Sequence, residues 1–125
     1  MKKIAIVDDD HIFQFTTKVK IEKLQLADEI KIFNDGEEVF EFLKNSSEDD
    51  WPNYLLLDIN MPIVDGWDFL KLYDQLSSEL KDFISIYMLS SSINPVDLEK
   101  ADKHPYIRKY VTKPLHDEVL KVILK

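Results

Sequence analysis

Short apolar runs alternate along the chain with stretches in which apolar residues recur every three or four positions. The runs cover residues 4–7, 30–33, 54–57, 84–89 and 106–111. Short runs made up mostly of apolar residues are typical of the strands of a buried parallel sheet. We therefore predict five strands at these positions.

The stretches between and after the runs predict five helices. The first begins after residue 10, with Asp9 or Asp10 as its N-cap, and ends near Leu24. The others are expected around residues 39–43, 69–76, 96–101 and 115–124, and the polar stretch 45–53 is expected to be a loop. The residues that we expect on the inward face of the first helix are Phe15, Thr16 and Val19.

Regular alternation of strand and helix predicts an α/β fold. Crossover connections between parallel strands are right-handed and place helices on both faces of the sheet. We therefore expect a doubly wound, five-stranded parallel sheet with five helices. The expected topology is the flavodoxin-like strand order 2-1-3-4-5 in a three-layer sandwich. Ligands bind such sheets at the carboxyl ends of the strands.

Composition narrows the class of protein. With 125 residues and no cysteine, we expect one domain, residues 1–125, in a reducing cytoplasm, with no disulfide or thiolate site. No apolar run approaches the roughly 20 residues of a membrane span. The formal charge is −8 and basic residues do not cluster, so direct nucleic-acid binding is not expected. Only two glycines occur, which excludes a glycine-rich phosphate loop.

Polar residues that could bind a metal or take part in a reaction follow four of the five strands. Asp8 and Asp9 end the first strand, Asp58 the third, Ser90 the fourth and Lys113 the fifth. Strands one and three are neighbours in the expected order, so the three acids converge in one cleft. Such close carboxylates need a cation, and Mg²⁺ with oxygen ligands suits them, while Lys113 brings a second positive charge.

Each of these residues also has an ordinary structural interpretation. A single Asp after a strand is usually a helix cap or a turn residue, and a single Ser90 or Lys113 would be a turn serine or a surface lysine. These interpretations weaken because all five positions fall on one edge of one sheet. We therefore treat them together as a candidate site.

The strand-end residues and the loops beside them also resemble a known family. The sequence resembles the receiver domain of two-component response regulators, as in the chemotaxis regulator, over essentially the whole chain. The residues that carry this resemblance are Val7-Asp8-Asp9, Leu57-Asp58, Met61-Pro62, Asp65-Gly66, Ser90 and Lys113-Pro114.

This resemblance implies roles for the acidic residues and the lysine. Asp58 would accept a phosphoryl group, and Lys113 would pair with that group. Asp9 would bind Mg²⁺ directly beside Asp58, Asp8 would hold the ion through water, and the backbone carbonyl of Asn60 would be a further ligand. Mg²⁺ is thus the implied cofactor.

The resemblance also implies a switch. The hydroxyl of Ser90 would hydrogen-bond the phosphoryl group, and Tyr110 would be the aromatic switch residue that fills the space left by Ser90. The Lys113-Pro114 peptide would be cis. The signal would leave through the surface of the fourth helix, fifth strand and fifth helix.

A function and partners follow by the same resemblance. We expect a stand-alone, phosphorylation-dependent signalling switch that catalyses only its own phosphorylation and dephosphorylation. Its partners would be a sensor histidine kinase or a histidine phosphotransfer protein and a downstream protein target, with no nucleic acid or membrane.

Two alternatives remain from other classes. One is a Mg²⁺-dependent phosphohydrolase with an aspartyl nucleophile, although such enzymes generally have a second acid where this chain has Asn60. The other is a receiver-like module that docks to a protein constitutively, without phosphorylation. The complete set of Asp8, Asp9, Asp58, Ser90 and Lys113 argues against it.

Overall fold

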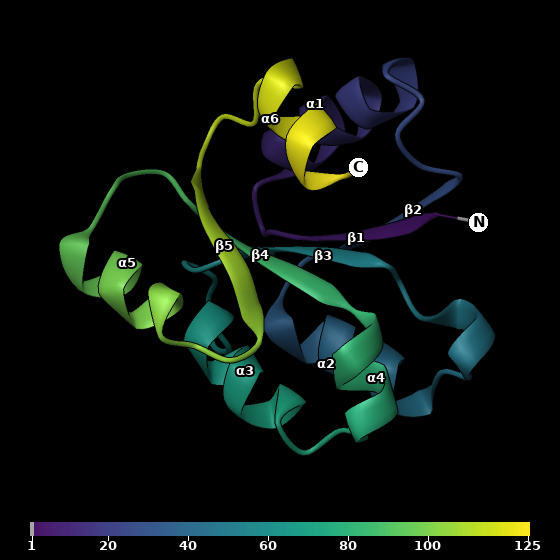
Figure 1. The fold of residues 1–125 in the computed structure, drawn as a ribbon, viewed down its shortest axis with the longest axis vertical. Coiled ribbons are helices and arrows are strands. Elements are labelled where there is room, and N and C mark those ends of the chain that lie inside the picture. Colours follow the sequence, from purple (N-terminus) through teal and green to yellow (C-terminus); the bar gives the residue numbers. More distant parts are fainter. Residues whose placement is uncertain (1) are drawn as a thin grey trace.

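Five parallel strands form one sheet in the computed structural model, which describes residues 2–125 (Figure 1). The sheet order is β2-β1-β3-β4-β5, so the predicted parallel sheet and its predicted order are both confirmed. The strands are β1 (Lys3–Val7), β2 (Glu29–Phe33), β3 (Tyr54–Asp58), β4 (Ser85–Ser90) and β5 (Ile107–Thr112).

Helices cover both faces of the sheet, which confirms the three-layer sandwich. Helices α1 and α6 pack on one face, and α2, α3, α4 and α5 pack on the other (Figure 1). The helices are α1 (His11–Lys23), α2 (Gly36–Asn45), α3 (Gly66–Tyr73), α4 (Ser78–Phe83), α5 (Pro95–Asp102) and α6 (Asp117–Ile123).

The structure has six α-helices among residues 2–125, whereas the sequence pattern predicted five, and α4 is the additional one. It has six residues and buries only Leu80, so it carries too few apolar positions to show a helical period. Its start is marked locally, because the side chain of Ser77 accepts a hydrogen bond from the amide of Leu80 at 3.3 Å. A 3-10 turn, Glu48–Asp50, also lies within the polar stretch that was expected to be a loop.

The predicted inward face of α1 is wrong. Phe15 is 67% exposed, Thr16 is exposed and Val19 is half-buried. The buried residues are instead Phe13, Gln14, Thr17 and Ile21. Ile12, Phe13 and Phe15 allow two helical registers, and two polar residues on the true inner face made the wrong register look more apolar.

The central strands alternate between the two cores. In β1, Ile4 and Ile6 pack beneath α1 and α6, whereas Ala5 and Val7 pack against the opposite layer. All four are at most 1% exposed, and burial of each large apolar side chain contributes roughly 1.5–3 kcal/mol. These contacts hold the carboxyl ends of β1 and β3 in place. Among residues 2–125, no helix has the length and apolar character needed to cross a membrane.

Candidate functional site

Strand register brings the first and third strand ends together. β1 pairs with β3 with Val7 opposite Leu57, so the next residues along each strand, Asp8 and Asp58, emerge side by side at the sheet edge. On the other side of β3, Asp58 lies opposite Leu89 of β4. The sheet therefore delivers the two acids to one place, as predicted from the strand order.

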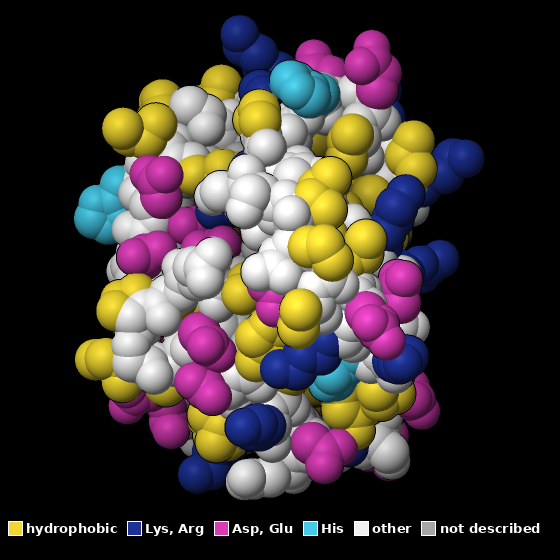
Figure 2. All heavy atoms as spheres, turned by 90° about the vertical axis from the view of Figure 1, so that its left-hand side faces the viewer, with side chains coloured by type: hydrophobic (Ala, Val, Ile, Leu, Met, Phe, Trp, Pro, Cys, Tyr) yellow, Lys and Arg dark blue, Asp and Glu magenta, His cyan; other side chains and the backbone are white. Residues whose placement is uncertain are grey.

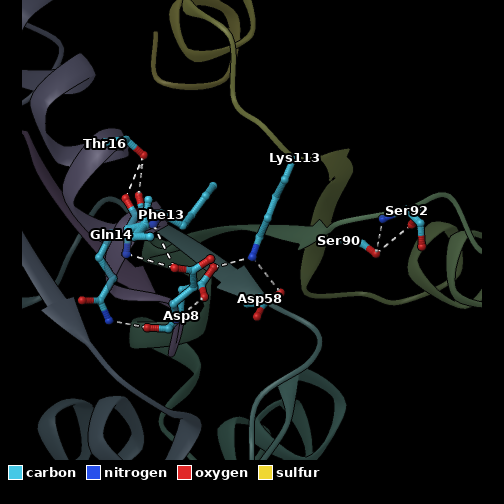
Figure 3. Close-up of polar contacts among 10 residues, drawn as sticks. Asp8, Phe13, Gln14, Thr16, Asp58, Ser90, Ser92 and Lys113 are labelled. Atoms are coloured by element: carbon cyan, nitrogen blue, oxygen red, sulfur yellow. Dashed lines mark hydrogen bonds and ion pairs between the residues drawn. The ribbon is translucent and has the colours of Figure 1, made fainter.

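The fourth and fifth strands complete this edge. Ser90 lies opposite Thr112 in the register of β4 and β5, and the amide of Lys113 donates to the carbonyl of Ser90 at 2.8 Å. The side chain of Lys113 then reaches back over the sheet toward Asp8 and Asp58 (Figure 3). The Lys113-Pro114 peptide bond is cis, which confirms the expectation.

The three consecutive acids after β1 have three different environments. Asp8 is fully buried, and its Oδ1 accepts a hydrogen bond from the amide of Asp10 at 2.9 Å. Asp9 is exposed at the surface of the cleft. Asp10 is the N-cap of α1, because its Oδ1 accepts from the amides of Ile12 at 2.9 Å and Phe13 at 3.3 Å. The cap is thus Asp10, and Asp8 and Asp9 are left for the site.

Asp8, Asp9 and Asp58 form a group that fits a divalent cation. One carboxylate oxygen from each lies within 4.8 Å of the other two. Ligands at the 2.0–2.1 Å typical of Mg²⁺ must lie within about 4.2 Å of one another, so small side-chain adjustments bring these oxygens around one ion. All are hard oxygen donors, the type that Mg²⁺ prefers.

Burial and charge perturb the ionisation of Asp58, whose side chain is 6% exposed. Burial, followed by the nearby charge of Asp8, raises the pKa of Asp58 to about 6. The charge and hydrogen bond of Lys113 and a hydrogen bond from the Asn60 backbone amide oppose this rise in the pKa. Asp58 is therefore mainly a carboxylate at neutral pH, but a costly one that additional positive charge would stabilise.

Lys113 supplies the positive charge in the cleft. Its Nζ lies 2.5 Å from Oδ2 of Asp8 and 3.3 Å from Oδ1 of Asp58, and its side chain is only 13% exposed. Burial lowers the pKa of Lys113, but the hydrogen bond and charge of Asp8 together with Asp58 outweigh it, and the pKa lies above its usual range. Lys113 therefore remains a cation between two carboxylates.

Ser90 and Tyr110 share one hydrogen-bond acceptor. The hydroxyl of Ser90 donates to the carbonyl of Ser92 at 2.7 Å and is turned toward Ser92 rather than Asp58 (Figure 3). The hydroxyl of Tyr110 donates to the same carbonyl at 3.0 Å, and Tyr110 is 9% exposed. The aromatic switch candidate thus already lies inward, bound to the loop that carries Ser90.

Three residues that the sequence did not assign to the site also shape it. The side-chain amide of Gln14 donates to the carbonyl of Asp8 and, at 2.9 Å, to Oδ1 of Asn34. The ring of Phe13 lies beneath the Lys113 ammonium, 4.4 Å from it. Gly66 packs so closely that a Cβ there would lie 2.8 Å from the Asp58 carbonyl. The spacing of Phe13, Thr17 and Ile21 was the available signal for Phe13.

The site can hold a cation and carry out group transfer. Asp58 is a buried carboxylate with a cation beside it and two further acids at metal-binding distance. Such an arrangement suits a nucleophilic carboxylate that accepts an anionic group, because the surrounding positive charge offsets the charge that develops.

Comparison with known proteins finds similar domains over nearly the whole chain. A model of the response regulator receiver domain matches residues 4–125. The crystal structure of a two component response regulator from Cytophaga hutchinsonii is 29% identical in sequence, with a TM-score of 0.91 over 98% of this chain and 93% of that chain. A response regulator receiver protein from Dyadobacter fermentans is 28% identical, with a TM-score of 0.89 over 100% of this chain and 96% of that chain.

A more distant structure shares the fold. The chemotaxis protein CheY4 of Vibrio cholerae is 22% identical, with a TM-score of 0.79 over 99% of this chain and 96% of that chain. At this identity the likeness concerns the fold alone. No curated protein matches the sequence.

Proposed function

Because this chain belongs to the response regulator receiver domain family, we propose that it is a signalling switch in which Asp58 accepts a phosphoryl group from a phosphohistidine. The observation that carries the proposal is the position of Lys113, whose ammonium lies 3.3 Å from the Asp58 carboxylate in a cleft with two further acids. A histidine kinase or a histidine phosphotransfer protein would provide the donor.

The chemical step transfers the group without an external co-reactant. An oxygen of Asp58 attacks the phosphorus and forms a P–O bond, while the P–N bond to the donor imidazole breaks. The electron pair of that bond stays on the leaving nitrogen, and the other ring nitrogen keeps its proton, so the donor leaves as neutral imidazole. The pKa of Asp58, about 6, leaves it mostly ionised and nucleophilic at neutral pH. Lys113 offsets negative charge on the transferred oxygens, and the hydroxyl of Ser90 can donate to one of them.

Mg²⁺ is the proposed cofactor. Asp9, Asp58 and the Asn60 carbonyl would hold it, with Asp8 binding through water, and it would supply further positive charge to the phosphoryl oxygens. Asp8 is suited to an indirect role because its Oδ1 already accepts from Asp10 and its Oδ2 pairs with Lys113.

Exposed apolar side chains around the cleft support a protein donor. Ile12 in the first turn of α1 is 76% exposed, and Ile63 in the loop after β3 is 93% exposed. Ile63 has φ of 66°, an unfavourable value for a β-branched residue, and it projects from the loop that follows Asp58. A donor protein would cover these side chains while it presents its phosphohistidine to Asp58.

The output surface would lie on α5, β5 and α6. Because α4 is an additional helix, α5 and α6 correspond to the predicted fourth and fifth helices. A groove of about 580 Å³ runs between β5 and α6, lined in part by Lys109, Val119 and Val122. Figure 2 shows the molecule from the side of α5, where hydrophobic side chains stand among charged ones. Exposed Ile93 and Val96 belong to this region.

Phosphorylation would reach this surface through Ser92. When the Ser90 hydroxyl turns to the phosphoryl group, the carbonyl of Ser92 loses one of its two donors, and Tyr110 remains as the other. The loop between β4 and α5 can then move with Tyr110 and change the surface that a downstream protein target recognises.

The chain would catalyse only its own phosphorylation and dephosphorylation, and we place it in the cytoplasm, where histidine kinases present their phosphorylated domains. A phosphohydrolase is the weaker alternative because Asn60, the residue two positions after Asp58, carries an amide that cannot act as a general acid. A constitutive docking module would not need the cation between the Asp8 and Asp58 carboxylates.

Incubation with a phosphoramidate and Mg²⁺, followed by intact mass measurement, tests the proposal. We expect one added phosphoryl group that needs Mg²⁺ and is absent in Asp58→Asn. Asp10→Asn is the matched control, because Asn caps a helix as well as Asp does and the site is unchanged. A wild-type protein that stays unlabelled at every Mg²⁺ concentration would rule out the switch, and turnover of phosphomonoesters would favour the hydrolase.

A further inference from the structure

Phe13 is placed beneath the lysine of the phosphorylation site. Its ring centroid lies 4.4 Å from the Nζ of Lys113, and the residue is 8% exposed in the first turn of α1. That turn is anchored by Asp10, whose side chain accepts a hydrogen bond from the backbone amide of Phe13 at 3.3 Å. The cap of its own helix therefore holds Phe13 on the α1 side of the cleft, beside the Lys113 side chain (Figure 3).

The ring is the third neighbour of the ammonium group. A lysine ammonium has three donors and no acceptor. Two of its neighbours are the carboxylates of Asp8 at 2.5 Å and Asp58 at 3.3 Å, and the aromatic face lies at the distance of a cation–π contact. Because the Lys113 side chain is only 13% exposed, little water can take the place of the ring.

A neutral aromatic ring attracts the Lys113 ammonium without neutralising its charge, whereas another carboxylate would neutralise it. A further carboxylate would compete for the charge that the phosphoryl oxygens need, whereas an aromatic face attracts the ammonium and leaves its charge in place. Asp58 is the carboxylate that a divalent cation and the phosphoryl group would engage directly, so its hold on Lys113 would weaken when the site is loaded, whereas Asp8 keeps its ion pair with the lysine. The contact with Phe13 does not depend on the Asp58 oxygens.

We propose that Phe13 is a positioning residue that, together with Asp8, keeps the Lys113 ammonium beside Asp58 when the Asp58 carboxylate is engaged by a cation or a phosphoryl group. The inference rests on the proposed function, because it assigns Phe13 to the same phosphorylation site. It distinguishes Phe13 from Phe15, which is on the same helix but is 67% exposed.

Three replacements separate the aromatic face from simple packing. Phe13→Leu keeps an apolar side chain but has no aromatic face, and Phe13→Tyr restores the face. Pentafluorophenylalanine at position 13 keeps nearly the shape of the ring but reverses the sign of its face, which covers the case in which Phe13→Leu fails to fold. Phe15→Leu is the matched control, because it makes the same change at an exposed position of α1.

Two measurements give the expected result. In NMR spectra without phosphodonor, the ε-methylene protons of Lys113 should lie upfield of those of other lysines because of the ring current. Phe13→Leu should remove this upfield shift. With saturating Mg²⁺, labelling of Asp58 by a phosphoramidate should slow by about tenfold in Phe13→Leu and in the pentafluoro variant. Phe13→Tyr should restore both the shift and the rate, and Phe15→Leu should match the wild type in both.

The outcomes separate this inference from the proposed function. Labelling of folded Phe13→Leu and of the pentafluoro variant at the wild-type rate overturns the positioning role and leaves the switch intact. An ordinary Lys113 ε-proton shift in the wild type overturns it also. If the wild type shows the upfield shift but is never labelled, the proposed function fails, and the positioning role fails with it.

Discussion

The ammonium nitrogen of Lys113 lies 2.5 Å from Oδ2 of Asp8, a residue 105 positions away in the sequence. This distance is shorter than the 3.3 Å from the same nitrogen to Asp58. The side chain of Asp8 is fully buried, and the ammonium of Lys113 compensates its negative charge. The lysine expected to pair with a phosphoryl group therefore also neutralises the acid at the base of the cleft.

Replacing Lys113 by methionine should destabilise the protein in the absence of Mg²⁺. The variant leaves the buried charge of Asp8 beside that of Asp58 without a partner, a change that costs about 3 kcal/mol. Urea unfolding measures the loss, and added Mg²⁺ should recover part of it. Lys103→Met is the control, because its ion pair with Glu99 at 2.8 Å is exposed and worth at most about 1 kcal/mol. Equal effects of the two variants would contradict the compensating role of Lys113.

Asp58→Asn should stabilise the protein at neutral pH. Burial and the charge of Asp8 raise the pKa of Asp58 from 3.8 to about 6, so the folded state keeps a proton that the unfolded state loses between these values. The contribution of Asp58 to stability is therefore fully present below pH 3.8 and is lost as the pH rises through about 6. We expect the free energy of unfolding of Asp58→Asn to exceed that of the wild type by about 3 kcal/mol at pH 7.

The pH dependence of this difference is the decisive measurement. Near pH 4 the folded wild type carries a protonated Asp58, and the difference between the two proteins should vanish. Asp102→Asn is the control, since Asp102 is exposed at the end of α5 and should change stability by less than about 0.5 kcal/mol. A stabilisation by Asp58→Asn that is equal at pH 4 and pH 7 would show that the charge of Asp58 is not its source.

Gly66→Ala should damage both stability and phosphorylation. A Cβ at Gly66 would lie 2.8 Å from the carbonyl oxygen of Asp58 and 3.0 Å from the Cα of Ile59, so the backbone that carries the phosphoacceptor would have to shift. We expect a loss of about 2 kcal/mol in urea unfolding, together with slower labelling by a phosphoramidate.

Gly36→Ala provides the comparison. The new Cβ there would lie 2.8 Å from the Cγ1 of Val64 and 3.1 Å from both the Val64 carbonyl and the Cβ of Phe69, so this replacement is also strained, but none of these atoms belongs to the strand that carries Asp58. Its cost in stability should be similar, and its labelling rate should be close to that of the wild type. Equal labelling rates for the Gly66 and Gly36 variants would argue against the close approach of Gly66 as a support of Asp58.

Ser90→Ala should uncouple Tyr110 from phosphorylation. In the wild type we expect labelling to shift the NMR signals of the Ser92 amide and the Tyr110 ring, because the Ser90 hydroxyl leaves the carbonyl of Ser92. Without that hydroxyl, labelling of Asp58 should slow by about tenfold, and the shift at Tyr110 should disappear. Ser90→Thr should retain both. Ser91→Ala, at the exposed neighbouring position, is the control, and an unaltered Tyr110 shift in Ser90→Ala would contradict the coupling.

Local pattern identified most of the elements but not the face of every helix. The five runs became β1 to β5, and they are nearly continuously apolar in the central strands β1, β3 and β4 because those strands are buried on both faces. The edge strands β2 and β5 carry charged residues as well. α1 was assigned the wrong face because Gln14 and Thr17 are buried polar residues, and hydrogen bonds such as that from Gln14 to Asn34 compensate their burial. A pattern of apolar positions cannot register such compensation, since the partner comes from another segment.

Strand periodicity and right-handed crossovers are local and general rules, and they were enough to predict that five polar residues follow strands at one edge of a parallel sheet: Asp8, Asp9, Asp58, Ser90 and Lys113. The burial of Asp8, the rise in the pKa of Asp58 to about 6 and the position of Phe13 beneath Lys113 became apparent only in the folded protein. These properties depend on burial and on distances of a few ångströms between residues far apart in the chain, and packing of the whole domain sets both.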